Sequence, residues 1–274
     1  MPPLNVTVDT IIVVGDIFAD ISAKMDQVLT ESEAIDRIQT EGCPQKQTIL
    51  SIGQGVDQRM IESAIMRRAR LDHAFADRFV IRGIDAMPRA VKRLAHKEKT
   101  ANILTSFAEK IDDENYRLDL HFASSNEFFG DHMTGMHIQG MALTEAARQA
   151  FLVVTEEFFL ADDNEDYYFV IKSLDSRYIN FVFPLGATID YRIVKQSKKA
   201  KYHSFEVEMK LMQAGQICAE FSVAFTAFES QRISERETEV FHDRLQQVVK
   251  QVQDAGPPVV ASDTEAKKEL AVEI

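Results

Sequence analysis

One short stretch of the chain carries side chains that could act together on a carbonyl group. Residues 128–151 read FFGDHMTGMHIQGMALTEAARQAF. Within this stretch, His132 precedes Glu145 by 13 residues and Gly140 precedes Glu145 by five. Histidine and carboxylate side chains are frequent general acids and bases, so His132 and Glu145 are the candidate catalytic pair.

The residues after Gly140 are expected to form a long helix that runs through the core to about Leu160, because most of them are apolar. The start of a helix presents free backbone N–H groups and the positive end of a dipole. Such groups can bind a carbonyl oxygen as negative charge develops on it, which makes Gly140 and Met141 candidates. Glu145 must find a partner there or stay protonated, and Arg148 lies on the same helical face.

Each of these residues also has an interpretation without catalysis. His132 could cap the helix from a loop, and His137 could be structural. Glu145 and Arg148 could form an ion pair of the core, because buried ion pairs exist without function. Gln149 could orient a neighbour or hydrogen-bond to backbone. The predicted site therefore has two parts and no metal. The first part is the catalytic pair. The second part binds the oxyanion or the substrate and consists of Gly140, Met141, Arg148, Gln149 and His137.

The first 88 residues alternate between strand and helix patterns. A β-branched run ends at Gly15, and the next segment has Thr30 as N-cap, Glu33 three residues later and Gly42 as a stop signal. This alternation continues with a strand, an amphipathic helix and a strand, and it predicts a small α/β (Rossmann-like) unit at 1–88. The GQG at 53–55 lacks the third glycine of a dinucleotide-binding loop, so turn glycines are the better interpretation.

Composition divides the rest of the chain. Residues 89–100 are basic and poor in large apolar side chains, which indicates a linker. From 101 to 230, strand patterns flank the long helix, and QAGQ at 213–216 stands where a hairpin turn belongs. Hairpin strands wrapped around one long helix make a hotdog fold, so we predict an α+β hotdog domain here. A C-terminal helix at 231–254 and a flexible tail at 255–274 complete the expected architecture.

Charge, cysteine content and hydropathy exclude several classes of protein. The net charge of −12 disfavours nucleic-acid binding, because phosphate binding needs a basic field. No apolar run approaches the roughly 20 residues that span a bilayer, and the N-terminus lacks a basic leader. Cys43 and Cys218 lie in segments of different character, which favours a reducing compartment over a disulfide framework. We therefore expect a cytoplasmic protein without nucleic-acid or membrane partners.

Three segments resemble the A-factor biosynthesis (AfsA-like) hotdog family. They are HKEKTANILTS, NEFFGDHMTGMHIQGMALTEAARQAF and YINFVFP, and the similarity covers roughly residues 95 to 230. The resemblance implies acyl-thioester chemistry, in which a 3-oxoacyl group passes from a carrier protein to dihydroxyacetone phosphate on the way to a γ-butyrolactone signal. Members usually carry two hotdog repeats in one chain. One repeat is visible here, so the resemblance implies a homodimer.

A more distant similarity is to the hotdog hydroxyacyl-carrier-protein dehydratases, whose histidine and glutamate positions fall on His132 and Glu145. The interval is one residue shorter than in that family, and Met133-Thr134 replaces its Phe-Pro. The open alternatives are therefore acyl transfer, thioester hydrolysis and dehydration. A non-catalytic acyl-binding or scaffold protein is the rival from another class. The expected partner is an acyl carrier protein or acyl-CoA, which is the substrate, and no further cofactor is predicted.

Two basic runs could receive that acidic partner, or a phosphate or coenzyme A. Such runs are usually solvated surface, but an acidic enzyme needs a local positive patch to receive an acidic carrier protein. The first lies in the expected linker and the second in an expected turn between strands. Their members are Arg89, Lys92, Arg93, Lys97 and Lys99 in the first run, and Lys195, Lys198, Lys199 and Lys201 in the second.

Overall fold

The computed structural model describes residues 8–83, 87–130, 135–161, 166–199 and 202–255. His132, Lys201 and residues 256–274 of the expected tail lie outside these described residues. The chain falls into two compact units. The first is Met1–Asn164 with Phe169–Ala227, and the second is Glu165–Tyr168 with Phe228–Ile274.

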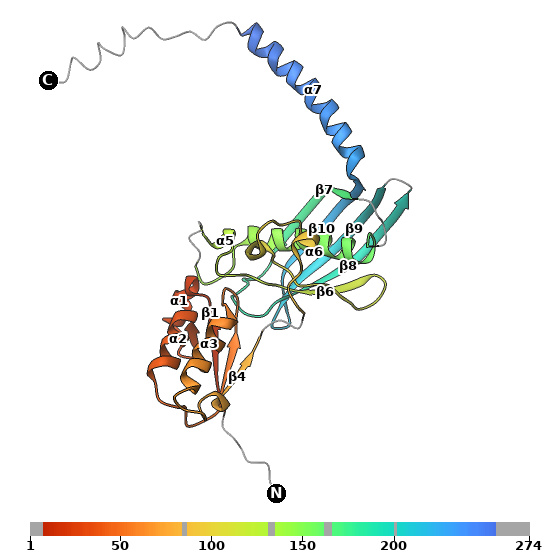
Figure 1. Cartoon of the computed structure of the whole chain (residues 1–274). Coiled ribbons are helices and arrows are strands. Elements are labelled where there is room, and N and C mark those ends of the chain that lie inside the picture. The colour runs from red at the N-terminus through yellow and green to blue at the C-terminus, as the bar shows by residue number, and fades with distance from the viewer. Residues whose placement is uncertain (1–7, 84–86, 131–134, 162–165, 200–201, 256–274) are drawn as a thin grey trace, which may run out of the picture. The chain divides into compact units, whose positions relative to one another are not determined.

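The first unit opens with a parallel sheet, drawn in red to orange in Figure 1. Its four strands have the order β2-β1-β3-β4 and are all parallel. Short helices connect them. The strands are β1 (Asp9–Val14), β2 (Val28–Thr30), β3 (Thr48–Ile52) and β4 (Phe79–Arg82), and the helices are α1 (Ala19–Ser22), α2 (Glu31–Thr40) and α3 (Gln58–Ala69), with 3₁₀ turns at Asp16–Phe18 and Ala76–Arg78.

Local sequence signals account for the first helix boundaries. The Thr30 side chain accepts a hydrogen bond from Glu33 N, and the Glu33 carboxylate accepts one from Thr30 N, which is a complete capping box. The N-cap predicted at Thr30 is therefore confirmed.

The sheet packs against these helices through an apolar cluster. Members of this cluster include Val13, Leu50, Ile61 and Phe75.

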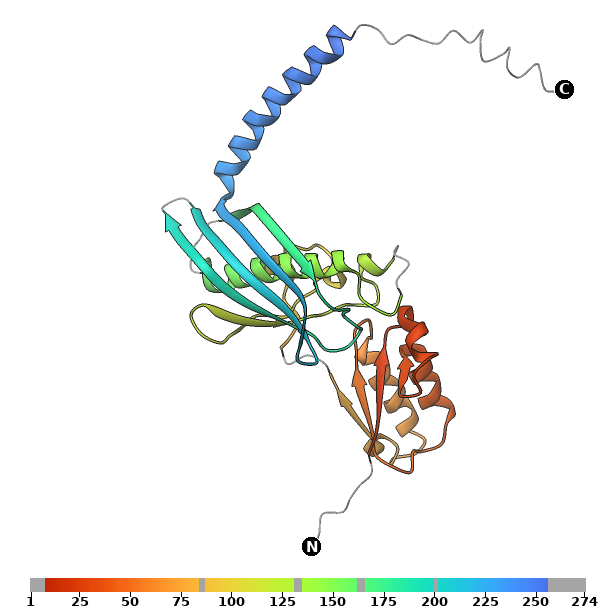
Figure 2. The same cartoon turned by 180° about the vertical axis from the view of Figure 1, so that it is seen from behind.

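The second sheet is antiparallel and six-stranded, with the order β5-β6-β8-β9-β10-β7. Helix α6 (Gly140–Phe158) lies across one face of it, as the two opposite views in Figures 1 and 2 show. Phe151 of α6 stacks on Phe225 of β10 with ring centroids 4.3 Å apart. The strands are β5 (Glu109–Lys110), β6 (Asn115–Asp119), β7 (Tyr167–Tyr178), β8 (Thr188–Lys199), β9 (Tyr202–Gln213) and β10 (Gln216–Glu229).

This arrangement confirms the fold class expected from the sequence. The chain is an α+β hotdog fold preceded by a small α/β unit. The turn at 213–216 joins β9 to β10, and its central residues Ala214 and Gly215 have φ values of 49° and 77°. Two left-handed residues make a type I′ turn, whose twist matches that of the flanking strands. The residue limits assigned above to each domain stay a prediction.

The basic segment before the hotdog sheet has structure of its own. It contains helix α4 (Lys92–Ala95) and a 3₁₀ turn at Thr100–Asn102. Leu94 and Ala95 are buried in the same apolar cluster as the inner face of α6. The segment is therefore packed against the hotdog core through Leu94 and Ala95.

Helix α7 (Ser230–Asp254) belongs to the second unit and is amphipathic. Its apolar side chains share one stripe, as expected from their spacing, and the structure shows that they are exposed. They include Phe241, Leu245, Val248, Val249 and Val252. Within the described part of the chain, no helix is long and apolar enough to cross a membrane.

Candidate functional site

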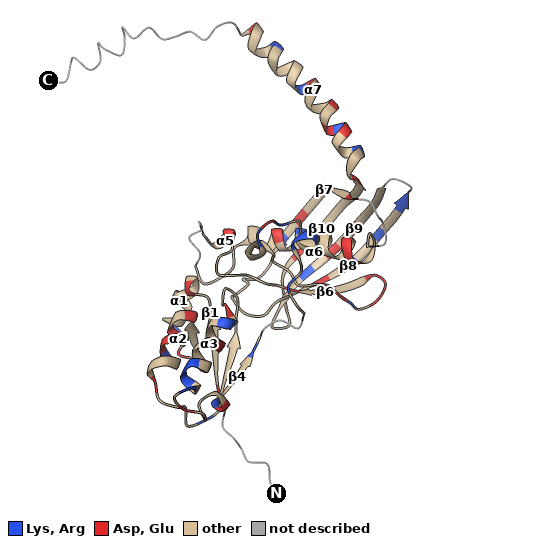
Figure 3. Cartoon of the chain, in the orientation of Figure 1, with Lys and Arg blue, Asp and Glu red and all other residues tan. Residues whose placement is uncertain are grey.

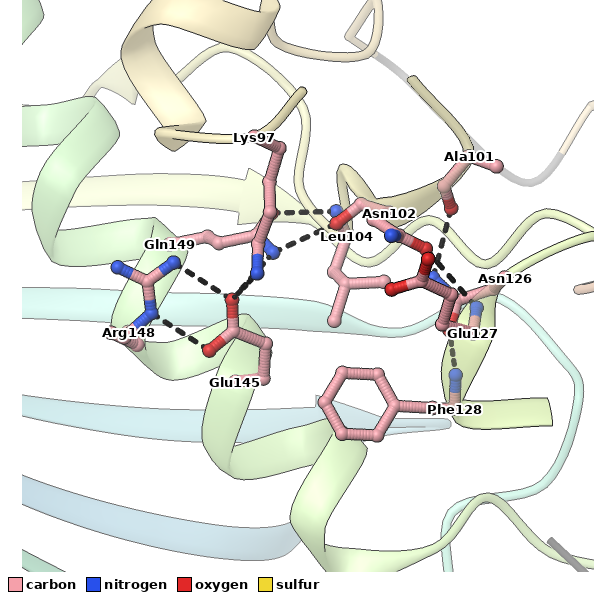
Figure 4. Close-up of polar contacts among 10 residues, drawn as sticks. All are labelled: Lys97, Ala101, Asn102, Leu104, Asn126, Glu127, Phe128, Glu145, Arg148 and Gln149. Atoms are coloured by element: carbon pink, nitrogen blue, oxygen red, sulfur yellow. Dashed lines mark hydrogen bonds and ion pairs between the residues drawn. The ribbon is translucent and has the colours of Figure 1, made fainter. Parts of the chain in front are cut away.

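Glu145, in the second turn of helix α6, is the centre of a polar cluster. Figure 4 shows the side chains of Lys97, Arg148 and Gln149 converging on its carboxylate. Arg148 Nε lies 2.7 Å from Oε2 and Nη2 lies 2.8 Å from Oε1. Lys97 Nζ lies 2.7 Å from Oε1, and Gln149 Nε2 lies 3.0 Å from the same atom. The structure therefore brings together three of the predicted site residues, Glu145, Arg148 and Gln149.

These contacts fix the charge of Glu145. Burial alone would raise the pKa of its carboxyl group, but hydrogen bonds from Arg148, Lys97 and Gln149 outweigh burial and lower that pKa to about 2. A carboxylate with so low a pKa is ionised at neutral pH and is a weak general base. With two cations against one carboxylate, the cluster carries one net positive charge. Its cations are partly open to solvent, with side-chain exposures of 25% for Lys97 and 27% for Arg148.

Gln149 ties a loop to helix α6. Its side chain is fully buried. Its Oε1 accepts a hydrogen bond from Leu104 N at 2.8 Å, and its Nε2 donates to Asn102 O at 2.9 Å as well as to Glu145. One of the interpretations left open by the sequence, a hydrogen bond to backbone, is therefore what this glutamine does. The same side chain also holds the Glu145 carboxylate in place.

The loop at 99–104 is held on its other side by helix α5 (Glu127–Gly130). Asn126 Nδ2 donates to Ala101 O at 2.8 Å, and Asn102 Oδ1 accepts from Glu127 N at 3.1 Å. The Asn126 carboxamide oxygen also accepts from Phe128 N at 2.9 Å. Figure 4 shows this second set of contacts beside the Glu145 cluster. Helices α5 and α6 thus contact the same loop from two sides.

The sequence predicted free amides at the start of helix α6. Among the described residues, the amides of Gly140 and Met141 donate no hydrogen bond, and the N-cap Gln139 makes no capping bond with its side chain. Tyr178 at the end of β7 covers this helix start. Its hydroxyl contacts Thr144 Oγ1 and donates to Gly140 O at 3.0 Å. A Cβ on residue 140 would lie 3.1 Å from the Tyr178 ring, so glycine fits there and larger residues crowd the ring.

Apolar side chains surround the same helix start. The ring of His137 packs on Phe181 with centroids 4.6 Å apart, and Ile138 N donates to Val182 O at 2.7 Å. His137 therefore lies at this rim rather than among the groups around Glu145. The exposed apolar members of the rim are Met136, Met141, Tyr178, Ile179, Phe181 and Phe183.

The sequence alone missed Lys97 as a member of the Glu145 cluster. It lies 48 residues before Glu145, and no periodic pattern links the two positions. Its neighbours in the basic segment are also paired: Arg93 and His96 with Glu156, and Lys99 with Glu127. Figure 3 shows basic positions in blue and acidic positions in red close together at helix α6. The segment therefore forms ion pairs with helices α5 and α6, and it has less free positive charge than its composition indicates.

Three members of the second basic run, Lys195, Lys198 and Lys199, lie on strand β8 and not in a turn as predicted, because β8 extends to Lys199. Lys195 pairs with Glu206 at 3.0 Å, and Lys199 lies over the Tyr202 ring at 5.5 Å.

Within the described residues, no group of three or more histidine, cysteine, aspartate or glutamate side chains could hold a metal ion. Cys43 is exposed and Cys218 is buried, and both are free.

A comparison with protein-family models places this site within a known domain. The model of the A-factor biosynthesis hotdog domain matches residues 81–229, which is more than half of the chain. The chain belongs to this family. The match begins within strand β4 and contains all residues of the Glu145 cluster, the start of helix α6 and Tyr178. The resemblance noted in the sequence is therefore confirmed. Comparison with curated proteins gave no match.

Solved structures similar to this member of the A-factor biosynthesis hotdog family are more distant. A thioesterase variant from Pseudomonas aeruginosa is 14% identical, with a TM-score of 0.36 over 53% of this chain and 99% of that one. The PaaI protein of the Escherichia coli phenylacetic acid degradation operon is 14% identical, with a TM-score of 0.31 over 44% and 81%. A thioesterase-type protein from Streptococcus pneumoniae, solved with coenzyme A, is 16% identical, with a TM-score of 0.30 over 44% and 84%. At these scores, the family match is the finding that identifies the chain.

Proposed function

We propose that this protein transfers an acyl group, such as a 3-oxoacyl group, from a carrier-protein or coenzyme A thioester to a small hydroxylated and phosphorylated acceptor. Family membership supports acyl-thioester processing as the general class of activity. The observation that carries the finer proposal is the Glu145 cluster, in which two partly exposed cations meet one carboxylate. The cytoplasm, where such thioesters are made, is the location we propose.

The free amides at the start of helix α6 suit the thioester. A carbonyl oxygen placed on Gly140 N and Met141 N would be stabilised as it becomes an oxyanion, because the amides and the helix dipole are already oriented toward it. Glu145 follows Gly140 by five residues, so it lies about 7.5 Å further along the helix axis at 1.5 Å per residue. This separation suits two parts of one bound complex, with the thioester at the helix start and the acceptor beside Glu145.

The cations of the cluster suit a phosphate on the acceptor. Arginine presents paired donors to phosphate oxygens, and lysine adds a compact positive charge. Lys97 and Arg148 could therefore bind the phosphate of a triose-type acceptor such as dihydroxyacetone phosphate. Glu145 would hold both cations in place and orient the acceptor. Because its pKa is about 2, this orienting role fits Glu145 better than the role of general base.

The reaction needs a base for the acceptor hydroxyl, and we propose His132 for that role from its place in the sequence. The hydroxyl oxygen would attack the thioester carbonyl carbon while its proton passes to the base. The tetrahedral intermediate then breaks its C–S bond, and the thiolate leaves and takes up the proton. An oxygen ester and a free thiol result, so no oxidant, reductant or metal is required.

We further propose that the protein is a homodimer that associates through the hotdog domain. Strand β7 lies last in the order of the antiparallel sheet, so no strand of the described residues pairs with its outer edge. Long exposed edge strands are templates for pairing with another chain. The edge and the residues that follow it carry exposed apolar side chains, namely Tyr168, Ile171, Tyr178, Ile179 and Phe181. A second copy would cover this surface and border the helix start where the thioester is proposed to bind.

The alternatives use the same site in other ways. Hydrolysis would need water in place of the acceptor. Dehydration needs a proton donor, and a carboxyl group with a pKa of about 2 is a poor one at neutral pH. A non-catalytic acyl-binding protein would use the apolar rim alone. The two cations at Glu145 favour transfer to, or binding of, an anionic molecule over these alternatives.

The test is a product assay with the purified full chain. A 3-oxoacyl carrier protein and dihydroxyacetone phosphate are mixed with the protein, and the products are followed by mass spectrometry. A new phosphorylated ester, together with free carrier thiol, supports the proposal. No ester and an unchanged thioester sink it. Free acid without acceptor identifies a thioesterase, loss of water from a 3-hydroxyacyl thioester identifies a dehydratase, and retained acyl ligand without turnover identifies a binding protein.

A further inference from the structure

The parallel sheet of the N-terminal unit has a position where many α/β proteins bind ligands. Its order is β2-β1-β3-β4, so the chain leaves β1 toward one side and β3 toward the other. Ligands of open α/β sheets bind at the carboxyl ends of the strands where the order reverses in this way. Here the loops that follow β1 and β3 carry Gly15, Phe18 and residues 53–55. The space between them is therefore the crevice in which a ligand is expected.

Main chain of the hotdog domain fills this crevice. The buried side chain of Gln54 donates to Leu120 O and accepts from Phe122 N, both at 2.6 Å. Gly55 N donates to Phe122 O at 2.8 Å. Gln54 thus extends the pairing of residues 120–122 as a neighbouring strand would, and these backbone groups are taken up by the contact.

The loop after β3 and the hotdog backbone are too close for a ligand to lie between them. Gln54 N donates to Pro184 O at 2.9 Å, and a Cβ on residue 53 would lie only 2.3 Å from the same oxygen. The Gly53-Gln54-Gly55 sequence, which resembles part of a nucleotide-binding loop, is therefore a docking loop for the hotdog backbone. Its first glycine is required for close approach.

Phe18 carries the contact on to the candidate site. It is fully buried, and its ring meets the edge of Phe129 in helix α5 with centroids 5.6 Å apart. Phe129 also stacks on Phe122 at 5.1 Å. Helix α5 and the adjoining Asn126 hold the loop at 99–104, and Gln149 holds that loop against Glu145. A continuous path of packed and hydrogen-bonded groups joins the crevice to the Glu145 cluster.

We propose that the N-terminal α/β unit is a positioning element for the thioester site, in which Phe18 and Gln54 fix residues 120–130 and so fix helix α5 beside α6. This inference rests on the proposed function for its catalytic consequence. The positioning itself does not need a substrate and can be measured without one. Phe18 and Gln54 are positioning residues, because neither contacts the Glu145 cluster.

The test compares two matched variants of the full chain, Phe18→Leu and Phe75→Leu. Both phenylalanines belong to the N-terminal unit and are buried, but Phe75 packs on Phe79 within the local core, with ring centroids 5.1 Å apart. Amide hydrogen exchange is followed by mass spectrometry. In Phe18→Leu, exchange of amides 120–130 should rise about tenfold while β8 and β9 stay protected. In Phe75→Leu, amides 120–130 should exchange as in the unchanged protein. Equal exchange of 120–130 in both variants overturns the proposal.

Kinetics and a second variant complete the test. In the transfer assay, Phe18→Leu should lower kcat about tenfold and change the KM of the acceptor less than about twofold, because binding groups remain while their alignment is lost. Gln54→Met, which keeps side-chain length but removes both hydrogen bonds to 120–122, should reproduce both effects if Phe18→Leu does not fold. Loosened amides with unchanged kcat would refute the positioning role. If no acceptor is turned over at all, the proposed function fails, while the exchange result still decides the docking claim.

Discussion

Arg148 and Glu145 form a two-point ion pair on one face of helix α6, with Nε 2.7 Å from Oε2 and Nη2 2.8 Å from Oε1. Lys97, from a segment 48 residues earlier, lies 2.7 Å from Oε1. The Glu145 carboxylate therefore binds two cations, Arg148 and Lys97, and not Arg148 alone. This third member distinguishes the cluster from an ordinary helix-surface pair between residues three apart.

The first prediction concerns the charge of Glu145. Glu145→Gln should lower kcat/KM about 100-fold, because Lys97 and Arg148 lose the carboxylate that aligns them. Its matched control is Glu156→Gln, since Glu156 lies on the same helix and also holds two partners, Arg93 and His96. Both changes should cost about 1–3 kcal/mol in the free energy of unfolding, measured in urea. Only Glu145→Gln should affect transfer, and equal activity of the two variants would remove Glu145 from the mechanism.

The second prediction is a pH dependence of stability. The pKa of Glu145 is about 2 in the folded chain, below its ordinary value of 4.5. Its ionised form therefore stabilises the fold fully above pH 4.5, and this contribution is lost as the pH falls from 4.5 toward 2. The contribution is at most about 3 kcal/mol. Urea unfolding at several pH values should show the stability gap between the unchanged protein and Glu145→Gln shrinking below pH 4.5. A gap that is constant down to pH 3 contradicts the depressed pKa.

The third prediction separates the two lysines of the basic segment. Lys97→Met should raise the KM for a phosphorylated acceptor about tenfold, because one charge contact to the phosphate is lost. Lys99→Met is the control, since Lys99 pairs with the exposed Glu127 instead. Its KM should stay within about twofold of the unchanged protein. An unphosphorylated acceptor should show no difference between the variants, and a difference there would speak against phosphate binding at Lys97.

The fourth prediction concerns the start of helix α6. Gly140→Ala would place a methyl group 3.1 Å from the Tyr178 ring, so the ring must shift and the groups around the free amides are crowded. The KM for the thioester should rise more than about fivefold. Gly135→Ala is the control in the nearby loop, because nothing lies within 4 Å of the added Cβ. Tyr178→Leu combined with Gly140→Ala should restore part of the loss if crowding is its cause.

The fifth prediction tests the proposed dimer. Ile171→Lys places a charge on the exposed edge strand β7 and should convert the dimer to a monomer in light scattering, because the charge would be buried between copies. Val194→Lys is the comparison, since Val194 is similarly exposed, at 48% against 41%, but lies on the inner strand β8. Val194→Lys should leave the mass unchanged. A monomeric unchanged protein would refute the proposed dimer directly.

Signals that act over a few residues could be predicted from the sequence. The capping box at Thr30 and the turn at Ala214-Gly215 involve only neighbouring residues, so propensity and spacing determine them. The apolar residues after Gly140 predict the long helix. The helical spacing in turn predicts that Glu145, Arg148 and Gln149 lie close together on it. The hotdog motif itself was recognisable because each of its segments is a continuous run of residues.

The partners of those residues were decided by tertiary structure. Lys97 reaches Glu145 because helix α4 buries Leu94 and Ala95, and nothing in the local pattern of the basic segment predicts which glutamate each cation meets. The side chain of Gln54 binds the backbone of Leu120, which lies 66 residues later in the chain, and this backbone occupies the crevice of the parallel sheet. The sequence by itself determined which helix carries the carboxylate. Only the packing of distant segments determined that this carboxylate is ionised and shared by two cations, because desolvation and ion pairing depend on distances in space and not on spacing along the chain.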